Sequence, residues 1–225
     1  SYLRLKTSET PIFLILAKKK QLLKAPFLGV VKNSWHFMIL TCCVGGVASS
    51  VVYIVKTYVN VFYSNIMHFS ISKSLIYVSY TSFILMICMP IAGAISDYIG
   101  RAKTLKIAAI MLFIFTAPVM NFMASENHLQ QFIGLTALGI LGGAMSGAAY
   151  IFVISLFEPK ERFSGVSFSY NLGVAIFGGT APMISRLLVE ETSINYSPAF
   201  YLMFVSVIFL IAMQILRRNI RAKMK

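Results

Sequence analysis

Six long apolar blocks constrain the fold of this chain more than any other feature of its sequence. They cover residues 35–62, 75–95, 104–123, 129–156, 165–189 and 198–216. A helix needs about 20 mostly apolar residues to cross the hydrocarbon core of a bilayer, and each block is close to or above that length. Short polar segments separate the blocks, for example Ser-Glu-Asn-His at 125–128. The pattern predicts an all-α integral membrane protein with six transmembrane helices.

Composition excludes a soluble domain. Of the 225 residues, 58% are hydrophobic and 12% are charged. A soluble domain has about 45–50% apolar and about 25% charged residues. So few charged side chains cannot cover a water-facing surface, whereas the same number suits the short loops between membrane helices.

The basic residues are unevenly divided between the two sets of loops. Six spans place both termini on one side, and that side carries seventeen Lys and Arg residues against three on the other. Because short cytoplasmic loops are enriched in Lys and Arg, we expect both termini in the cytoplasm. The same asymmetry explains the net charge of +13 without a nucleic-acid partner.

The sequence divides into a basic cytoplasmic segment (1–34), the transmembrane bundle (35–216) and a basic cytoplasmic tail (217–225). Within the first segment, residues 9–30 mix apolar side chains with three consecutive lysines, and are too charged to span a membrane. They predict either a helix on the membrane surface or a solvated linker. Because the chain begins with Ser1 and not Met, we expect a fragment, a cleaved product or half of a split gene.

No catalytic or metal-binding pattern is present in the sequence. Cys42, Cys43 and Cys88 lie inside apolar blocks, without the paired spacing of a metal site. Neither a phosphate-binding glycine loop nor a nucleophile elbow occurs, and no Asp or Glu lies in the middle of a span. We therefore expect neither an enzyme nor a bound metal or cofactor.

The first span carries polar residues at a helical spacing. Positions separated by four, three and four residues share one face of an α-helix, and here they hold Ser49, Tyr53, Lys56 and Asn60. A polar stripe on a membrane helix normally faces a cavity or the interior of the bundle. We call these four residues the polar stripe and treat them as candidate substrate contacts.

Lys56 admits two interpretations. Its ammonium could hold a substrate carboxylate. Alternatively, it lies about 31 Å from Trp35 along a helix that rises about 1.5 Å per residue, which places it near the outer interface, where it would snorkel toward water. Tyr150, Tyr170 and Asn171 are further candidates for substrate contact, although tyrosines also serve as interface anchors.

Small residues recur at intervals of four in three spans. The sets are Gly139, Gly143 and Gly147; Gly165, Ser169 and Gly173; and the pairs Gly45 with Ser49 and Gly46 with Ser50. Small residues at this spacing allow helix backbones to pack closely. Close packing is one interpretation, and helices that also slide during transport are the other.

The turn between the second and third spans resembles a known loop signature. Residues 93–103 read Gly-Ala-Ile-Ser-Asp-Tyr-Ile-Gly-Arg-Ala-Lys. They are similar to the G-x-x-x-D-[RK]-x-G-[RK]-[RK] signature of the major facilitator superfamily, with matches at Gly93, Asp97, Gly100 and Arg101. Positions 98 and 102 hold Tyr and Ala where the signature has basic residues. In this interpretation Gly93 lets helices approach and Gly100 permits the turn. Asp97 would pair with Arg101 or with a neighbouring helix end as a latch.

Further segments resemble the metabolite:proton symporter family of that superfamily. Glu-Thr-Pro-Ile-Phe at 9–13 is similar to its central cytoplasmic loop. Residues 162–182, which include Ser-Tyr-Asn-Leu-Gly and Ala-Ile-Phe-Gly-Gly-Thr-Ala-Pro, are similar to the entry into its eleventh helix. The Ser-Leu-Phe-Glu-Pro at 155–159 departs from the family, because its carboxylate is displaced from the usual position.

The resemblance covers nearly the whole chain and the second half of the family's length. It implies the C-terminal half of a proton-coupled symporter in the bacterial inner membrane, folded as a three-plus-three inverted repeat. The first span would line the central cavity, and an N-terminal six-helix half would be the partner. The expected coupling ion is a proton, and the carboxylate that binds it would lie in that partner. The implied substrate is a small osmolyte such as proline or betaine. An organic acid such as citrate, 2-oxoglutarate or shikimate, and a fragment that does not transport, are the alternatives.

Overall fold

The computed structural model describes residues 26–216, with side chains from residue 29 onward. Within this range all regular elements are helical, and six helices are long and apolar enough to cross a membrane. They run Gly29–Ile66, Ile71–Ile99, Arg101–Met123, His128–Leu156, Pro159–Thr192 and Pro198–Ile215. The predicted all-α architecture with six spans is confirmed. Most of the predicted surface segment and the basic tail lie outside the described residues.

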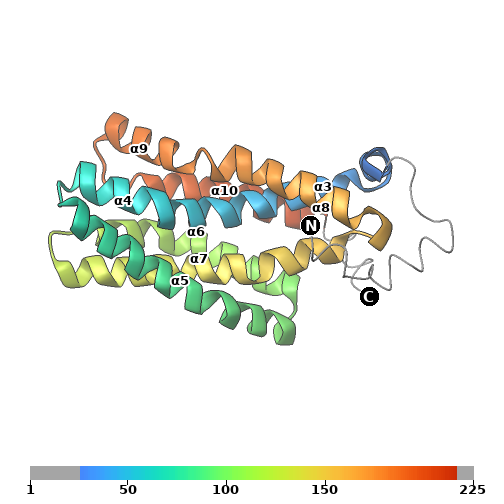
Figure 1. Ribbon diagram of the computed structural model, residues 1–225, viewed down its shortest axis with the longest axis horizontal. Coiled ribbons are helices and arrows are strands. Elements are labelled where there is room, and N and C mark those ends of the chain that lie inside the picture. Colours follow the sequence, from blue (N-terminus) through green and yellow to red (C-terminus); the bar gives the residue numbers. More distant parts are fainter. Residues whose placement is uncertain (1–25, 217–225) are drawn as a thin grey trace, which may run out of the picture.

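The helices lie side by side along one long axis (Figure 1). The first span consists of α3 (Pro26–Tyr53), η1 (Ile54–Tyr58), α4 (Val59–Val61) and η2 (Phe62–Ile66). The next three spans are α5 (Ile71–Ile99), α6 (Arg101–Met123) and α7 (His128–Leu156). The fifth consists of α8 (Pro159–Gly173), η3 (Val174–Gly178) and α9 (Ala181–Thr192), and the sixth is α10 (Pro198–Ile215).

Each predicted span lies inside the corresponding helix, except that the last span ends one residue beyond its helix. Most helices extend further than the predicted span at one or both ends. Hydropathy marks the apolar part of a span, whereas a helix continues until its terminal backbone groups are capped. At the start of α5 the Ser70 side chain accepts a hydrogen bond from the Lys73 amide at 3.4 Å. At its end Gly100 has φ of +94°, which glycine adopts readily, and α6 begins one residue later.

The packing of the spans follows an inverted repeat. α5 packs on α7, and α3 packs on α8, which is the same pairing once spans one to three are exchanged for spans four to six. Likewise, α6 packs on α7, and α10 packs on α3. Spans one and four run in opposite directions along the bundle (Figure 1). This is the relation expected for two three-helix units of inverted topology.

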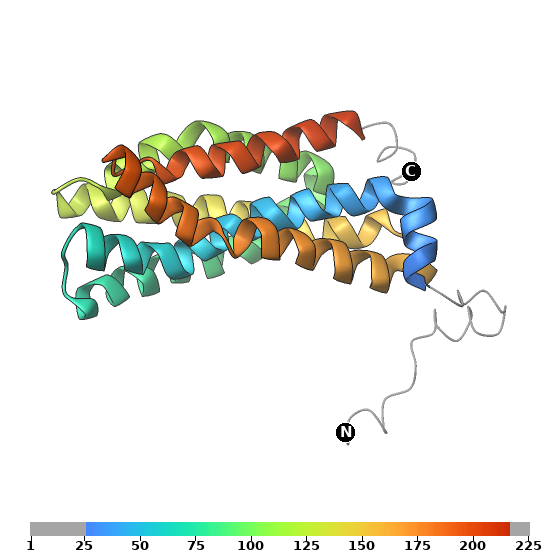
Figure 2. The same ribbon diagram turned by 90° about the horizontal axis from the view of Figure 1, so that it is seen from above.

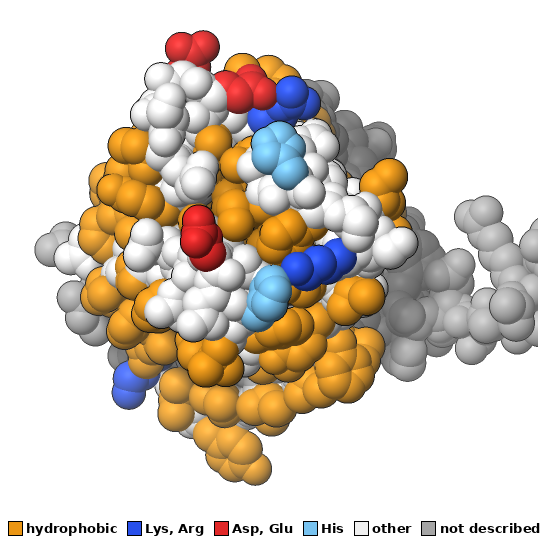
Figure 3. Space-filling model, turned by 90° about the vertical axis from the view of Figure 1, so that its left-hand side faces the viewer, with side chains coloured by type: hydrophobic (Ala, Val, Ile, Leu, Met, Phe, Trp, Pro, Cys, Tyr) orange, Lys and Arg blue, Asp and Glu red, His pale blue; other side chains and the backbone are white. Residues whose placement is uncertain are grey.

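The bundle has two distinct ends. The terminal end holds both described ends of the chain, the turn at Gly100 and the turn at 157–158 (Figure 2). The far end holds the connections at 67–70, 124–127 and 193–197. Figure 3 looks onto the far end, where a few charged side chains are scattered among polar and hydrophobic ones.

The first helix changes direction at Ser34. This residue has φ of −130° and ψ of 21°, which interrupts the α-helical backbone of α3. The piece before it runs across the long axis of the bundle, and the piece after it runs along that axis (Figure 2). The interruption falls at the predicted boundary between the segment 1–34 and the transmembrane bundle.

Spans one and five are not regular α-helices. Each contains five-residue π-helical turns, two in span one (η1 and η2) and one in span five (η3). A π turn accommodates an extra residue and often occurs at functional sites. The residues after such a turn are therefore rotated about the helix axis relative to a regular α-helix.

Candidate functional site

The polar stripe of span one does not present four equivalent side chains. Ser49 is buried, and its hydroxyl donates a hydrogen bond to the Gly45 carbonyl at 2.5 Å within the same helix. A side chain added to Gly178 of η3 would meet Ser49 Cβ at 2.7 Å, so the two helices are in close contact here. Ser49 therefore lies at a helix–helix contact in the interior of the bundle, apart from the exposed members of the stripe.

Tyr53 and Lys56 are the exposed members of the stripe. Lys56 lies within η1, and no ion pair or hydrogen bond involves its side chain among the described residues. Its ammonium is thus free to interact with a ligand or with a partner that covers this face.

Asn60 lies beyond η1 and turns toward span two. Its side-chain oxygen accepts a hydrogen bond from the Ser74 hydroxyl of α5 at 2.9 Å. Ser74 is fully buried, so this bond joins the first two spans inside the bundle. The α-helical spacing predicted that Asn60 and Ser49 share one face, but the π turn between them alters the register and gives each a different neighbour.

Tyr150 and Tyr170 lie close together, as a pair contributed by α7 and α8. Their ring centroids are 5.6 Å apart and nearly perpendicular, at 88°. The amide of the neighbouring Asn171 donates to the Ser167 carbonyl of its own helix at 2.7 Å, and Asn171 remains exposed. Perpendicular aromatic pairs of this kind are energetically favourable. Tyr150, Tyr170 and Asn171 thus form a polar and aromatic group that is distinct from the polar stripe.

The two groups lie at different depths in the bundle. Tyr170 contacts α3 at Gly45, where an added side chain would meet the Tyr170 ring at 3.2 Å. Lys56 lies eleven residues further along the same span, which corresponds to about 16 Å at about 1.5 Å per residue. The predicted substrate contacts thus fall into two groups, Tyr53 with Lys56 and the tyrosine pair with Asn171, at different positions along the bundle axis.

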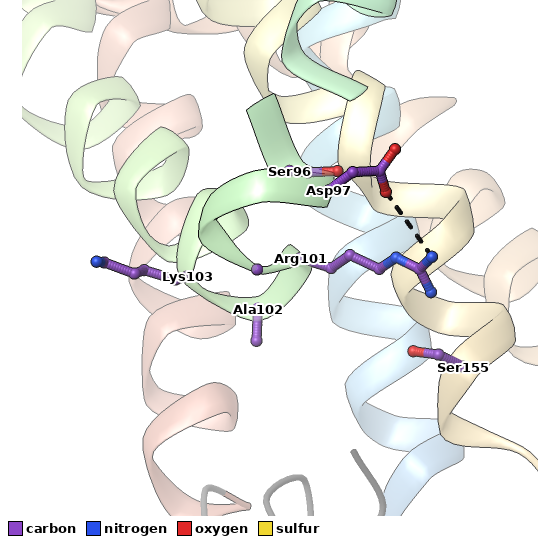
Figure 4. Close-up of a pocket in the computed structure, with 7 residues that line it drawn as sticks. Ser96, Asp97, Arg101, Ala102, Lys103 and Ser155 are labelled. Carbon is purple, nitrogen blue, oxygen red and sulfur yellow. Dashed lines mark ion pairs between the residues drawn. The ribbon is translucent and has the colours of Figure 1, made fainter. Parts of the chain in front are cut away.

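The signature loop forms a pocket at the terminal end (Figure 4). Its volume is about 530 Å³, and it is lined by Ser96, Asp97, Gly100, Arg101, Ala102, Lys103 and Ser155. Arg101 Nη2 lies 3.8 Å from Asp97 Oδ1, with both side chains partly exposed. This is an ion-pair distance and exceeds the 2.7–2.9 Å or so of a charge-assisted hydrogen bond. The ion pair expected from the sequence is present, and it is loose.

Helices α5 and α7 pack closely beside this loop, at Gly93 and Gly147. A side chain added to Gly93 would meet the Gly147 carbonyl at 3.5 Å, an ordinary contact. A side chain added to Gly147 would meet Ala92 Cβ at 2.9 Å and would collide with the Met89 carbonyl. The Gly93 amide nitrogen would also lie 3.1 Å from a side chain on Gly147, so both glycines lie at this contact, and Gly147 is the one at which a side chain would not fit.

The remaining small-residue sets lie at two helix contacts. Gly139 and Gly143 of α7 face α5, where added side chains would meet Ile84 Cβ at 2.9 Å and Cys88 Cβ at 2.5 Å. Gly173 of α8 packs against the backbone of α3, where an added side chain would collide with the Cys42 carbonyl. Gly165 instead faces the ring of Phe157, Ser169 is buried, and the Ser50 hydroxyl donates to the Gly46 carbonyl at 2.7 Å.

A polar and aromatic network at the far end was not anticipated from the sequence. The Tyr77 hydroxyl donates to Gln131 Oε1 at 2.9 Å, and Gln131 Nε2 donates to the Ser125 carbonyl at 2.7 Å. Tyr63 donates to the Met123 carbonyl at 3.0 Å and stacks edge-on against Tyr77. These bonds join spans one, two and four to the connection after span three. We call this set, together with Phe69 and His128, the far-end network.

Glu161 was also missed, because the sequence placed it in a loop. It lies in the first turn of α8 with 3% of its surface exposed, and its carboxylate accepts a hydrogen bond from Ser34 at 2.8 Å. The bond joins the bend of the first helix to the start of span five. The bend and the turn are 127 residues apart in the chain, so no local pattern could have shown their contact.

Six spans paired as an inverted repeat are consistent with half of a major facilitator fold. Comparison with curated proteins agrees. The ectoine/proline transporter ProP of Corynebacterium glutamicum is 24% identical over 217 residues, which are 92% of this chain and 43% of that protein. A citrate–proton symporter of Klebsiella pneumoniae is 28% identical over 93% of this chain and 47% of its own length.

A third relative is the glycine betaine/proline/ectoine/pipecolic acid transporter OusA of Dickeya dadantii. It is 28% identical over 93% of this chain and 44% of its own length. No family model and no solved structure matches the chain. The chain spans about half the length of the curated relatives it matches.

These relatives are transporters and not enzymes, and they are metabolite:proton symporters of the major facilitator superfamily. The chain is their homologue, so the resemblance seen in the signature loop and in the fifth span is confirmed. It is a multi-pass membrane protein.

Proposed function

We propose that this chain is the C-terminal half of a proton-coupled secondary transporter for a small osmolyte such as proline or betaine. The partner is an N-terminal six-helix half, and the location is the bacterial inner membrane with both described ends of the chain facing the cytoplasm. The breadth of the similarity supports this proposal, because relatives named as transporters match more than nine-tenths of the chain.

The observation that carries the proposal is the exposed side chain of Lys56 within the first membrane span. A lysine that faces lipid at the centre of the membrane costs about 2.5–3.5 kcal/mol, and the cost falls toward the interface, where the ammonium reaches water. Lys56 has no anionic partner among the described residues. A second six-helix half that closes a water-filled cavity over this face removes the cost and leaves the ammonium available to a substrate carboxylate.

Alternating access supplies the mechanism. The two halves rock about a site near the middle of the membrane, and each half contributes one wall. In this chain the wall is formed by Tyr53 and Lys56. Tyr150, Tyr170 and Asn171 belong to the same wall and lie closer to the terminal end of the bundle. The Asp97–Arg101 pair is exposed at the edge of the bundle, where it can engage a helix end of the partner and hold one state.

A symporter of organic acids is the second candidate. Citrate–proton symporters are as similar to this chain as the osmolyte transporters are, at 28% and 29% identity. Lys56 suits either substrate class, because proline, betaine and citrate all carry a carboxylate. The organic-acid proposal requires a further cation from the partner half, because Lys56 provides a single positive charge.

Uptake measurements in a transporter-deficient bacterium test these proposals. We expect uptake of radiolabelled proline or betaine when the chain is co-expressed with an N-terminal half from one of its relatives, and none from the chain alone. Lys56→Gln should raise the KM at least tenfold, whereas Lys106→Gln, an exposed lysine at the terminal end, should leave it unchanged.

Each other outcome has a definite meaning. Uptake of citrate and not of proline favours the organic-acid symporter. Robust proton-dependent uptake by the chain alone overturns the half-transporter proposal and requires a homodimer with a complete cavity. No uptake in any combination, with both halves present in the membrane, favours a fragment that does not transport.

A further inference from the structure

Span five is interrupted halfway along its length. After α8 the backbone makes the π turn Val174–Gly178, in which the Gly179 amide donates to the Val174 carbonyl at 2.8 Å. Gly179 and Thr180 then form a turn, and α9 begins with Ala181. Both figures of the whole chain show the ribbon changing direction at this point (Figures 1 and 2). The two successive glycines, Gly178 and Gly179, and the nearby Pro182 disfavour a regular α-helix in this stretch.

Side-chain hydroxyls satisfy the backbone carbonyls at the interruption. The Tyr201 hydroxyl of α10 donates to the Phe177 carbonyl at 2.5 Å, and the Thr180 hydroxyl donates to the Ile176 carbonyl at 2.6 Å. The two hydroxyl oxygens are 3.4 Å apart. Tyr201 is 7% exposed, so this contact lies inside the bundle. Within a membrane, backbone groups that lose helical partners need such substitutes.

The interruption lies directly against the polar stripe. A side chain on Gly178 would meet Tyr53 Cδ2 at 3.3 Å, in addition to its contact with Ser49. Beyond the interruption, the twelve-residue helix α9 packs on η1, the turn that carries Lys56, and on α10. Any rotation of α9 about the interruption therefore changes its position over η1.

We propose that the segment Gly178–Gly179–Thr180 is a hinge about which α9 opens and closes over η1, and that Tyr201 is the positioning residue that holds the closed arrangement. The α8 half of the span is fixed, because Gly173 packs against the α3 backbone. The α9 half packs mainly on α10 and η1, and its contact with α3 is smaller than that of α8. The hinge stands on the contacts described above, and its role as a gate over Lys56 rests on the proposed function.

Hydrogen exchange of the purified full chain in lipid nanodiscs tests the hinge. Tyr201→Phe removes the hydroxyl and keeps the ring. It should increase exchange of α9 amides, such as that of Ile184 bonded to the Thr180 carbonyl, by about threefold to tenfold, because one buried hydrogen bond is lost. Tyr196→Phe is the matched control, since this tyrosine is partly exposed and its hydroxyl has no hydrogen bond among the described residues.

A second pair of variants separates the hinge from general loosening. Thr180→Val should also increase exchange in α9, and Thr180→Ser, which retains the hydroxyl, should restore the original rate. Exchange in α7 should not change in any of these variants. Unchanged α9 exchange in Tyr201→Phe, or an equal increase throughout the bundle, would overturn the hinge.

The exchange measurement needs no transport activity, so it decides the hinge even when no uptake is found. Where uptake is found with a partner half, Tyr201→Phe should alter kcat more than KM, because it changes the opening of α9 and leaves Lys56 in place. An increase in α9 exchange without any change in kcat would retain the hinge and remove its role as a gate.

Discussion

The two ends of the bundle are held together in different ways. At the far end, Tyr63, Tyr77 and Gln131 form a buried network of hydrogen bonds and stacked rings that joins several spans. At the terminal end, the signature loop depends on one ion pair, between Asp97 and Arg101, whose side chains are 62% and 40% exposed. The polar groups of the far-end network have partners within the described residues, whereas the signature loop at the terminal end has an exposed ion pair and an open pocket.

For the proposed N-terminal half, this difference predicts the end of the bundle at which it acts. A network of satisfied, buried polar groups stabilises one arrangement and gains nothing from further contacts. An exposed ion pair contributes little to stability, because water solvates both charges. We therefore expect the proposed partner half to act at the terminal end, where it would disturb few stabilising contacts.

The largest expected contrast between the ends is in accessibility from the two sides of the membrane. In a variant whose three native cysteines are serines, Lys103→Cys marks the terminal end and Glu126→Cys marks the far end. An impermeant maleimide added to intact cells should label position 126 and not position 103, because basic loops remain in the cytoplasm. Labelling of both positions from one side would contradict the six-span topology.

The next largest effect is expected from Gln131→Leu in the far-end network. The substitution should destabilise the chain by about 3 kcal/mol, because each buried polar group left without a partner costs about 1–3 kcal/mol. Gln131 is fully buried, and its loss affects both Tyr77 and the Ser125 carbonyl. Unfolding in mixed micelles, followed by circular dichroism, measures the change. Gln214→Leu on the exposed face of α10 is the control, and an equal loss in both variants would refute the special role of the network.

A smaller effect is expected from Tyr77→Phe. The ring and its contacts with Tyr63 remain, and one hydroxyl is lost, so stability should fall by about 1 kcal/mol. The same unfolding assay applies. Tyr98→Phe, at the terminal end, removes a hydroxyl from a side chain that is 90% exposed and should have no measurable effect. A similar loss in both tyrosine variants would mean that the two ends do not differ.

The smallest effect on stability is expected from Asp97→Asn, at no more than about 0.5 kcal/mol, because the ion pair is exposed. Its effect on function should be large, with uptake lost in cells that also express an N-terminal half. Glu190→Gln is the control, because it breaks a similarly exposed pair with Arg186 at the far end. Unchanged uptake in Asp97→Asn would mean that the signature loop does not act as a latch.

The sequence predicted the course of each span more reliably than the direction of its side chains. The apolar blocks located all six helices, since hydropathy and length alone decide whether a segment crosses a bilayer. The expectation that Ser49 and Asn60 share one helical face assumed a regular α-helix, and the π turn η1 lies between them. The Asp97–Arg101 pair was predicted correctly because the two residues lie four apart across one turn.

Residues far apart in the chain account for what the sequence did not show. Ser34 and Glu161 are separated by 127 residues, and Tyr77 and Gln131 by 54. Their contacts depend on which spans are neighbours and on the rotation of each helix. Neither quantity has a local signature, so Glu161 was placed in a loop and the far-end network was not recognised.

The sequence by itself determined the number of spans, the class of the fold, the asymmetry of charge and the signature turn at Gly100. Each of these follows from local properties: hydropathy, helix length, the distribution of Lys and Arg, and a backbone conformation that glycine tolerates. Only the tertiary structure decided where spans one and five depart from the α-helix and which side chains face outward. The Phe177 carbonyl, in the π turn before Gly179, accepts a hydrogen bond from the Tyr201 hydroxyl, 24 residues further along the chain, and such a contact is set by the packed bundle and not by the segment itself.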